Sequence, residues 1–213
     1  MAWQLVGLIG VGLAYLLGST PTGYLLGRWL KGIDLREIGS GSTGATNVLR
    51  NVGKGPAIAV LLIDALKGAA AVLICSQWLY GLAVEVPSVL TPAWWGCIGG
   101  LVALLGHSKS IWLGFKGGKS VAAGLGVLFA LNWQIALGTL AAFGVVVLLV
   151  RMVSAGSMAA AIAVNILMWI FVQPLPFKAF ALLGGAYVIW RHQTNIQRIL
   201  AGTEPRLGQK VGT

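Results

Sequence analysis

Charged residues are scarce in this sequence. Only 9% of its 213 residues are Asp, Glu, Lys or Arg, and 57% are hydrophobic. Soluble domains carry about 25% charged residues, so this chain cannot cover a water-exposed surface. Its apolar residues form continuous runs rather than alternating patterns, which favours membrane-spanning helices over a β-barrel. We therefore predict an integral membrane protein of the all-α class.

Metal-binding and disulfide-forming residues are equally sparse. The five acidic residues are scattered, which argues against a two-metal site. The two histidines, His107 and His192, have no clustered cysteines or carboxylates near them in the sequence, so they form a poor metal site. Cys75 and Cys97 lie in apolar runs and are interpreted as small buried hydrophobes. We predict that the protein needs no metal and no cofactor.

Two familiar catalytic patterns are also missing. A His-x-x-x-x-Asp acyltransferase dyad would need aspartate five residues after a histidine, but Trp112 and Gln197 occupy those positions. No Gly-x-Ser-x-Gly nucleophile elbow occurs either. The sequence therefore contains no recognisable protein nucleophile.

Seven apolar segments predict seven transmembrane helices within a single membrane-embedded domain, residues 1–213. The segments are 3–27, 56–79, 93–106, 120–133, 134–150, 157–172 and 178–190. Several are short enough to be tilted, kinked or incompletely spanning. Gly18-Ser19-Thr20-Pro21 predicts a kink in the first helix, with its freed backbone groups facing protein or a cavity. Many of the 31 glycines suit close packing between helices.

The net charge of +10 indicates how the chain is oriented in the membrane, because basic residues are enriched in cytoplasmic loops. An N-terminus outside places the loops 28–54, 107–119 and 151–155 and the C-terminal tail in the cytoplasm. Thirteen of the fifteen lysines and arginines then lie on the cytoplasmic side, all except Lys67 and Lys178. Nucleic-acid binding is disfavoured because no dense basic run occurs. The start of the sequence lacks a basic region, so no cleaved signal peptide is expected.

A polar glycine-rich stretch, Ile38 to Arg50, separates the first two apolar segments. Glycines allow backbone N–H groups to converge on an anion, and Ser40, Asn47 and Arg50 add side-chain donors. Gly39, Gly41 and Gly44 also match the dinucleotide-binding pattern G-x-G-x-x-G. That pattern requires a preceding strand, whereas an apolar helix is expected here. The stretch is therefore interpreted as a phosphate-binding loop at the membrane surface.

Three further polar clusters are expected on the same cytoplasmic face. They are His107 with Lys116-Gly117-Gly118-Lys119, then Ser154-Ala155-Gly156-Ser157, then His192 with Asn195 and Glu204. The second cluster ends like a P-loop, but Leu113 stands where that motif needs its first glycine. A glycine pair beside lysines at a helix start still attracts phosphate.

Asp64 and Lys67 lie inside the second apolar segment, three residues apart on one helical face. Charged residues at such depth are costly and often functional. They are equally consistent with a self-contained ion pair that locks helix packing.

In their order along the chain, these motifs resemble the bacterial membrane acyl-phosphate:glycerol-3-phosphate acyltransferases, which have seven transmembrane helices. The motifs run from Gly39 to Arg50, from Gly106 to Lys119, and from Arg191 to Glu204. The sequence departs from the family at Ser42, Ser110 and Ser120, where asparagine, proline and glycine are usual.

The resemblance implies transfer of a fatty acyl group from acyl phosphate to the 1-hydroxyl of sn-glycerol 3-phosphate. Lysophosphatidic acid and inorganic phosphate would be the products. The residues implied to be catalytic are Ser40, Arg50, Lys119, Ser154, His192 and Asn195. Those implied to bind or support substrate are Gly39, Gly41, Asn47, His107, Lys116, Gly117 and Gly118. The resemblance places the enzyme in the bacterial inner membrane, with its active site on the cytoplasmic face and no obligate protein partner.

Two other functions fit parts of the sequence. A transporter for a phosphorylated metabolite would account for the charges at Asp64 and Lys67, although no internal repeat of the two halves is evident. An enzyme that transfers a phospho-alcohol group between lipids would usually need clustered aspartates and a divalent metal, and the five scattered acids argue against it.

Overall fold

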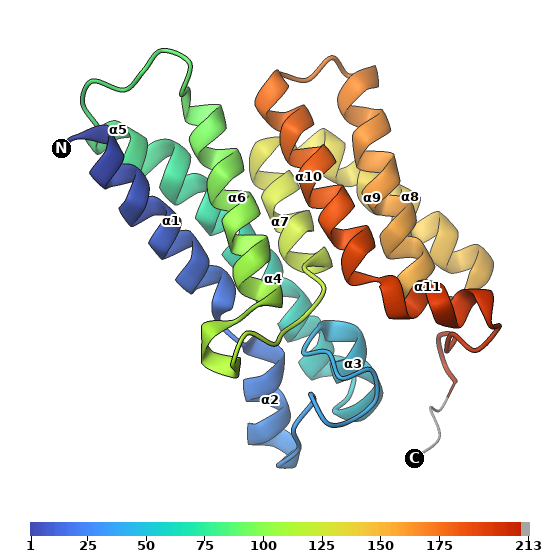
Figure 1. Cartoon of the computed structure of the whole chain (residues 1–213). Coiled ribbons are helices and arrows are strands. Elements are labelled where there is room, and N and C mark those ends of the chain that lie inside the picture. Colours follow the sequence, from blue (N-terminus) through green and yellow to red (C-terminus); the bar gives the residue numbers. More distant parts are fainter. Residues whose placement is uncertain (210–213) are drawn as a thin grey trace.

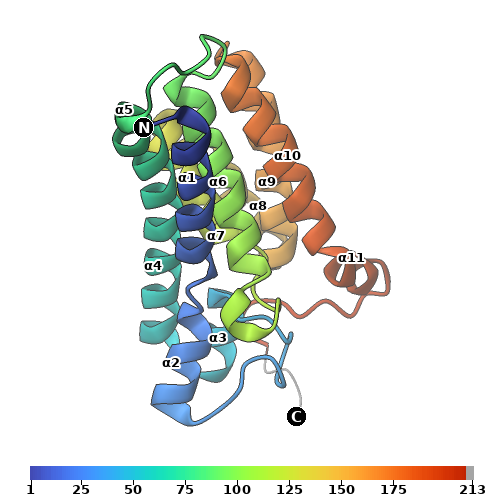
Figure 2. The same ribbon diagram turned by 60° about the vertical axis from the view of Figure 1, so that its left-hand side comes forward.

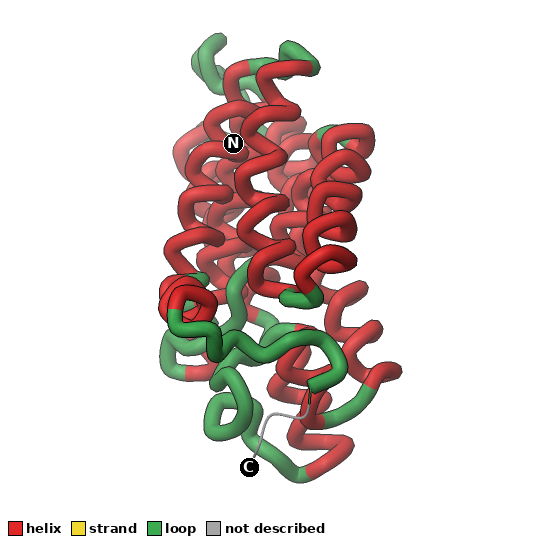
Figure 3. The backbone as a smooth tube through the Cα atoms, turned by 90° about the vertical axis from the view of Figure 1, so that its right-hand side faces the viewer, coloured by secondary structure: helices red, strands yellow, loops and turns green. Residues whose placement is uncertain are grey.

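The computed structural model describes residues 1–209, and within them the chain is helical with no β-strand (Figure 3). The elements are α1 (Trp3–Ser19), α2 (Thr22–Lys31), α3 (Ala45–Asn51), α4 (Lys54–Leu73), the π-helix η1 (Ile74–Leu79), α5 (Tyr80–Leu82), α6 (Pro92–Ser108), the 3-10 helix η2 (Ile111–Leu113), α7 (Val121–Leu131), α8 (Trp133–Val150), α9 (Val153–Ile170), α10 (Leu175–Arg191) and α11 (Gln193–Leu200). The predicted all-α class is confirmed.

Four helical stretches of the described chain are long and apolar enough to cross a membrane. They are Trp3–Lys31, Lys54–Leu82, Trp133–Val150 and Val153–Ile170. The surface of the bundle is strongly apolar, with 82% of Leu148 and 77% of Leu149 exposed. Water would not tolerate such a surface, whereas lipid tails match it.

The first apolar segment is interrupted at Thr20-Pro21, which separates α1 from α2. Proline has no N–H to donate to the helix ladder, so the helical bond from residue 21 to the Leu17 carbonyl is missing, and the Thr20 N–H donates to that carbonyl instead at 3.3 Å. The Thr20 carbonyl accepts a hydrogen bond from Lys67 Nζ at 2.9 Å. The interruption predicted at this position is therefore confirmed, and the Thr20 carbonyl beside it is turned toward protein.

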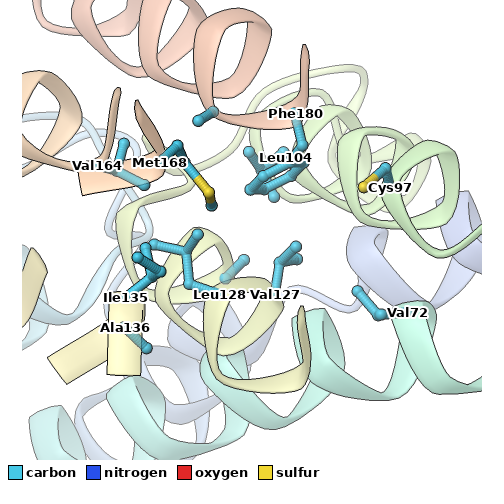
Figure 4. Packing of buried hydrophobic residues seen from close by; sticks show 12 residues of the cluster. Val72, Cys97, Leu104, Val127, Leu128, Ile135, Ala136, Val164, Met168 and Phe180 are labelled. Carbon is cyan, nitrogen blue, oxygen red and sulfur yellow. The ribbon is translucent and has the colours of Figure 1, made fainter. Parts of the chain in front are cut away.

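Small residues let the long helices approach one another closely. A side chain added at Gly68 of α4 would collide with the Ala123 backbone of α7, and one at Gly126 with the Ala65 backbone. Close approach of this kind is the main source of helix association where lipid removes the hydrophobic driving force. Beside this contact lies the largest core cluster, where Phe180, Met168 and Ile135 from three helices point into one interior region (Figure 4).

The two ends of the bundle differ in character. The N-terminus and the loop after α5 lie at one end, whereas α2, α3 and the C-terminal segment lie at the other (Figures 1 and 2). The connections before α7 and α9 reach this second end as well. All four sequence motifs therefore meet at the same end of the molecule.

Three local predictions were wrong. Residues 45–51 were expected as loop and residues 193–200 as polar tail, yet both are helices, α3 and α11. Each is short, and helices of this length depend on packing that composition does not reveal. Ser154 was expected in the loop 151–155, but α9 begins at Val153, so Ser154 lies in its first turn, whereas Ser157 lies in a helix as expected.

Candidate active site

A single cavity of about 550 Å³ connects the polar end of the bundle with its apolar interior. Its mouth is lined by Ser40, Asn47, Arg50, His107, Lys119, Ser154, His192, Asn195 and Glu204. Its interior is lined mainly by apolar residues of α4, α7, α8, α9 and α10. The arrangement suits a molecule with an anionic head and an apolar tail.

Asn47 organises the glycine-rich loop. Its side-chain Nδ2 lies 3.0, 3.1 and 2.9 Å from the carbonyl oxygens of Leu35, Ile38 and Ser42. Its Oδ1 accepts a hydrogen bond from the Ser40 backbone N–H at 3.2 Å. Asn47 is almost fully buried, so these bonds fix the loop from beneath.

Gly39 is required by both conformation and space. Its φ of +61° lies in the left-handed region, and a side chain there would collide with Asn47 Oδ1. The loop can therefore close over Asn47 only with glycine at this position. This closure leaves Ser40 on the cavity wall.

A network of buried side chains forms the opposite wall of the mouth. Ser154 Oγ and Asn195 Nδ2 donate to Glu204 Oε1 at 2.6 and 2.7 Å, and Arg198 Nε donates to Glu204 Oε2 at 2.7 Å. Lys119 Nζ donates to Asn195 Oδ1. The C-terminal segment thus folds back over the cavity, and Arg50 donates to the Pro205 carbonyl at 3.3 Å.

The electrostatics of this wall follow from burial and crowded positive charge. Burial lowers the pKa of Lys119 to about 8, and the neighbouring guanidinium of Arg198 lowers it in the same direction. Burial would raise the pKa of Glu204, but hydrogen bonds from Ser154, Arg198 and Asn195 outweigh it, and the net shift is downward. Glu204 is therefore an ionised carboxylate engaged by its neighbours.

His192 is held neutral at the end of α10. Burial lowers the pKa of its imidazole to about 4, and the positive charge of Lys119 acts in the same direction. Its Nδ1 lies 2.7 Å from the Val188 carbonyl, which can only accept a hydrogen bond. Nδ1 therefore carries the proton, and Nε2 is left as a hydrogen-bond acceptor beside the cavity.

His107 supports the loop that carries Lys119. Side chains added at Gly117 or Gly118 would collide with the His107 backbone or imidazole, so both glycines permit the loop to lie directly on this residue. The Gly118 N–H donates to the His107 carbonyl at 3.1 Å, and Arg191 donates to the Gly118 carbonyl at 3.2 Å. Contacts from two helices thus fix the backbone next to Lys119.

The predicted pairing of Asp64 with Lys67 is present. Lys67 Nζ lies 2.8 Å from Asp64 Oδ1, and His107 Nδ1 lies 3.6 Å from the same oxygen. With the Thr20 carbonyl as its second acceptor, Lys67 is satisfied by protein groups. The pair joins α4 to the break after α1 and to α6, and Asp64 also lines the cavity.

The structure brings together most of the residues predicted from sequence. Eight of them line the cavity, namely Ser40, Asn47, Arg50, His107, Lys119, Ser154, His192 and Asn195. Gly39, Gly117 and Gly118 lie behind the lining and shape its loops, and Gly41, with φ +66°, lies in the same turn as Gly39. Lys116 is exposed and does not line the cavity, so its role in binding stays a prediction.

Sequence reasoning named Arg191 at the start of the third motif without giving it a role, and it missed Arg198. Arg198 binds Glu204, and Arg191 binds the Gly118 carbonyl. A signal for Arg198 was its place three residues after Asn195, which puts both on one face if that stretch is helical. Because residues 193–200 were interpreted as a polar tail and not as a helix, the spacing of Asn195 and Arg198 was not used to place them on one face.

Comparison with known proteins agrees with this site. A family described as Glycerol-3-phosphate acyltransferase matches residues 8–202. A glycerol-3-phosphate acyltransferase of Synechococcus sp. (strain JA-2-3B'a(2-13)) is 54% identical over 207 residues, covering 97% of this chain and 98% of the relative. The enzyme of Rippkaea orientalis is 56% identical over 215 residues, covering 99% and 97%.

A solved structure is similar over almost the whole chain. It is a crystal structure of PlsY (YgiH), an integral membrane glycerol 3-phosphate acyltransferase, in its glycerol 3-phosphate form. The TM-score is 0.84 at 38% identity, with 95% of this chain and 96% of that chain covered. The lysophosphatidic acid form of the same protein gives a TM-score of 0.82. On this evidence the chain belongs to the glycerol-3-phosphate acyltransferase family.

Proposed function

We propose that this chain transfers a fatty acyl group from acyl phosphate to the sn-1 hydroxyl of glycerol 3-phosphate, giving lysophosphatidic acid and inorganic phosphate. One observation carries the proposal: a cavity with an apolar interior opens onto a mouth that holds Arg50, Lys119 and Arg198 close to its polar lining. An acyl phosphate has the matching shape, with a doubly acidic head group and an apolar tail.

The two phosphates occupy different walls in this proposal. Ser40, which lines the cavity, holds the phosphate of the donor, and Gly39 and Gly41 shape the loop that carries it. The Ser40 and Gly41 N–H groups already donate to Asn47 Oδ1 and to the Ile38 carbonyl, so the side chain of Ser40 makes this contact. Lys119, Ser154, His192 and Asn195 position glycerol 3-phosphate from the opposite wall, and Arg50, at the end of α3, joins them from the side of the glycine-rich loop. Asn47, His107, Gly117 and Gly118 support these walls, and Lys116 attracts phosphate from the exposed side of its loop.

The reaction needs no protein nucleophile because the donor is already activated. The sn-1 oxygen attacks the acyl carbon, a new C–O ester bond forms, and the bond between the acyl carbon and the phosphate oxygen breaks. The hydroxyl proton passes to the departing phosphate. His192 accepts a hydrogen bond from the hydroxyl at Nε2 and orients it, while the cations stabilise the developing negative charge.

Seven spans with the N-terminus outside remain the topology we propose. The support is the gathering of α2, α3, α11 and the basic loops at one end of the bundle (Figure 1). By the positive-inside rule we expect that end to face the cytoplasm, with the bundle in the bacterial inner membrane. Glycerol 3-phosphate then enters from water, and the acyl phosphate enters from the lipid phase.

The test is donor-dependent product formation by purified protein in detergent with EDTA present. Myristoyl phosphate and glycerol 3-phosphate should give lysophosphatidic acid and phosphate in equal amounts, and myristoyl-CoA should give neither. Lys119→Ala should reduce kcat/KM by about tenfold or more, since a charge-assisted hydrogen bond contributes about 1.5–3 kcal/mol, whereas exposed Lys116→Ala should have a smaller effect. Folded protein that forms no product with either donor would refute the proposal.

A further inference from the structure

The apolar part of the cavity has a defined inner end. On α7, α8, α9 and α10 the last lining residues are Leu128, Thr139, Val164 and Phe180. All four are at least nine-tenths buried. The cavity lining therefore ends, on all four helices, at a buried residue.

Beyond these four residues, away from the cavity mouth, the next helical turn belongs to the fully packed core. Ile135 on α8 and Met168 on α9 do not line the cavity and are 1% and 0% exposed. Figure 4 shows both side chains in the same interior region as Phe180. Protein interiors of this density admit no further methylene group without displacement of a side chain.

The depth of the cavity can be read along two helices. His192 at the mouth and Phe180 at the inner end are twelve residues apart, which corresponds to about 18 Å at about 1.5 Å per residue. Ser154 and Val164 are ten residues apart, which corresponds to about 15 Å. An extended hydrocarbon chain advances about 1.3 Å per carbon, so roughly 12 to 14 carbons fit.

We infer that this inner end, formed chiefly by Phe180 with Thr139 opposite, limits the length of the acyl chain that the enzyme transfers. The inference rests on the proposed acyl-phosphate donor. Thr139 Oγ1 is buried without a hydrogen-bond partner on the wall of this apolar space, so it places a polar atom near the end of the acyl chain. A chain that is too long must either displace Phe180 or leave sideways.

A side exit is the structural alternative to a length limit. Ile58 and Leu61 of α4 and Leu140 of α8 line the cavity and are also 58%, 43% and 40% exposed. The cavity therefore reaches the lipid-facing surface between α4 and α8. If the chain leaves there, the residues at the inner end will have no influence on chain length.

The test is competition among lauroyl, myristoyl, palmitoyl and stearoyl phosphates in one detergent mixture, with products resolved by mass spectrometry. Product ratios give relative kcat/KM values that do not depend on how much of a variant is folded. Phe180→Ala should raise the stearoyl-to-myristoyl ratio by about fivefold or more, because it removes the overpacking that a long chain causes.

A second variant shifts the limit the other way. A Cβ atom at Gly184, one turn closer to the mouth, would have its nearest neighbours at 3.5 Å or more, which is ordinary contact. Gly184 lines the cavity, so a larger side chain there would take up cavity space. Gly184→Leu should therefore lower the same ratio by about fivefold or more. Phe177→Ala removes an aromatic ring from α10 outside the cavity lining and should leave the ratio within about twofold.

Opposite shifts in Phe180→Ala and Gly184→Leu, with Phe177→Ala unchanged, would support the length limit. Wild-type ratios in both cavity variants would overturn it and favour the side exit, while leaving the proposed reaction intact. Use of acyl-CoA but of no acyl phosphate would refute the proposed donor instead, and the same length ratios measured with acyl-CoA would still decide the inference.

Discussion

The lowered pKa of Lys119 predicts how binding of glycerol 3-phosphate depends on pH. Because burial and nearby cations bring this pKa to about 8, Lys119 is about nine-tenths charged at pH 7 and about one-tenth charged at pH 9. Only the charged form binds phosphate strongly. We therefore expect the KM for glycerol 3-phosphate to rise about tenfold from pH 7 to pH 9.

The assay is initial-rate phosphate release at saturating acyl phosphate, corrected at each pH for spontaneous hydrolysis of the donor. Lys119→Arg keeps its charge throughout this range and should remove most of the alkaline rise. Lys116→Arg, at the exposed lysine of the same loop, should behave as wild type. A KM that is flat in the wild type, or an alkaline rise that persists in Lys119→Arg, would show that another group controls binding.

Three further outcomes follow from contacts in the structure. Asp64→Asn leaves Lys67 buried without its carboxylate and should destabilise the protein by about 3–5 kcal/mol. Asp64→Asn combined with Lys67→Met should recover most of this lost stability. Thermal unfolding in detergent measures the stability of both variants. Asn47→Ala removes the bonds beneath the glycine-rich loop and should raise the KM for acyl phosphate more than that for glycerol 3-phosphate, as steady-state kinetics would show. Ser154→Ala removes the hydroxyl that donates to Glu204 and should raise the KM for glycerol 3-phosphate about tenfold. An unchanged KM would place this hydroxyl outside the phosphate site.

Features that depend on local chemistry could be predicted from sequence. The break at Thr20-Pro21 follows from a missing N–H, and the pairing of Asp64 with Lys67 follows from helical spacing. The lengths of the apolar runs predicted the bounds of the long helices to within a few residues. These predictions held because neighbouring residues in the chain suffice to cause each feature.

Features that depend on packing could not be predicted in this way. Spacing alone does not tell which of Lys116 and Lys119 faces the cavity, since the loop path is set by its contact with His107. The return of Glu204 to Ser154 depends on where α11 directs the chain. His107 beside Asp64 likewise depends on how α4 packs against α6.

The charge balance at the mouth bears on the choice of donor. Among residues 1–209, Arg50, Lys119 and Arg198 lie around the carboxylate of Glu204, which is already hydrogen-bonded. A further positive charge on His192 is unfavourable there, and a group with a pKa of about 4 is a weak base at neutral pH. In the proposed mechanism the hydroxyl proton is therefore taken by a group that the substrate brings, and a phosphate, with its second pKa at about 6, is suited to this. An acyl phosphate supplies leaving group and base in one molecule, which a thioester does not, so the same cations that bind the donor also favour the reaction it undergoes.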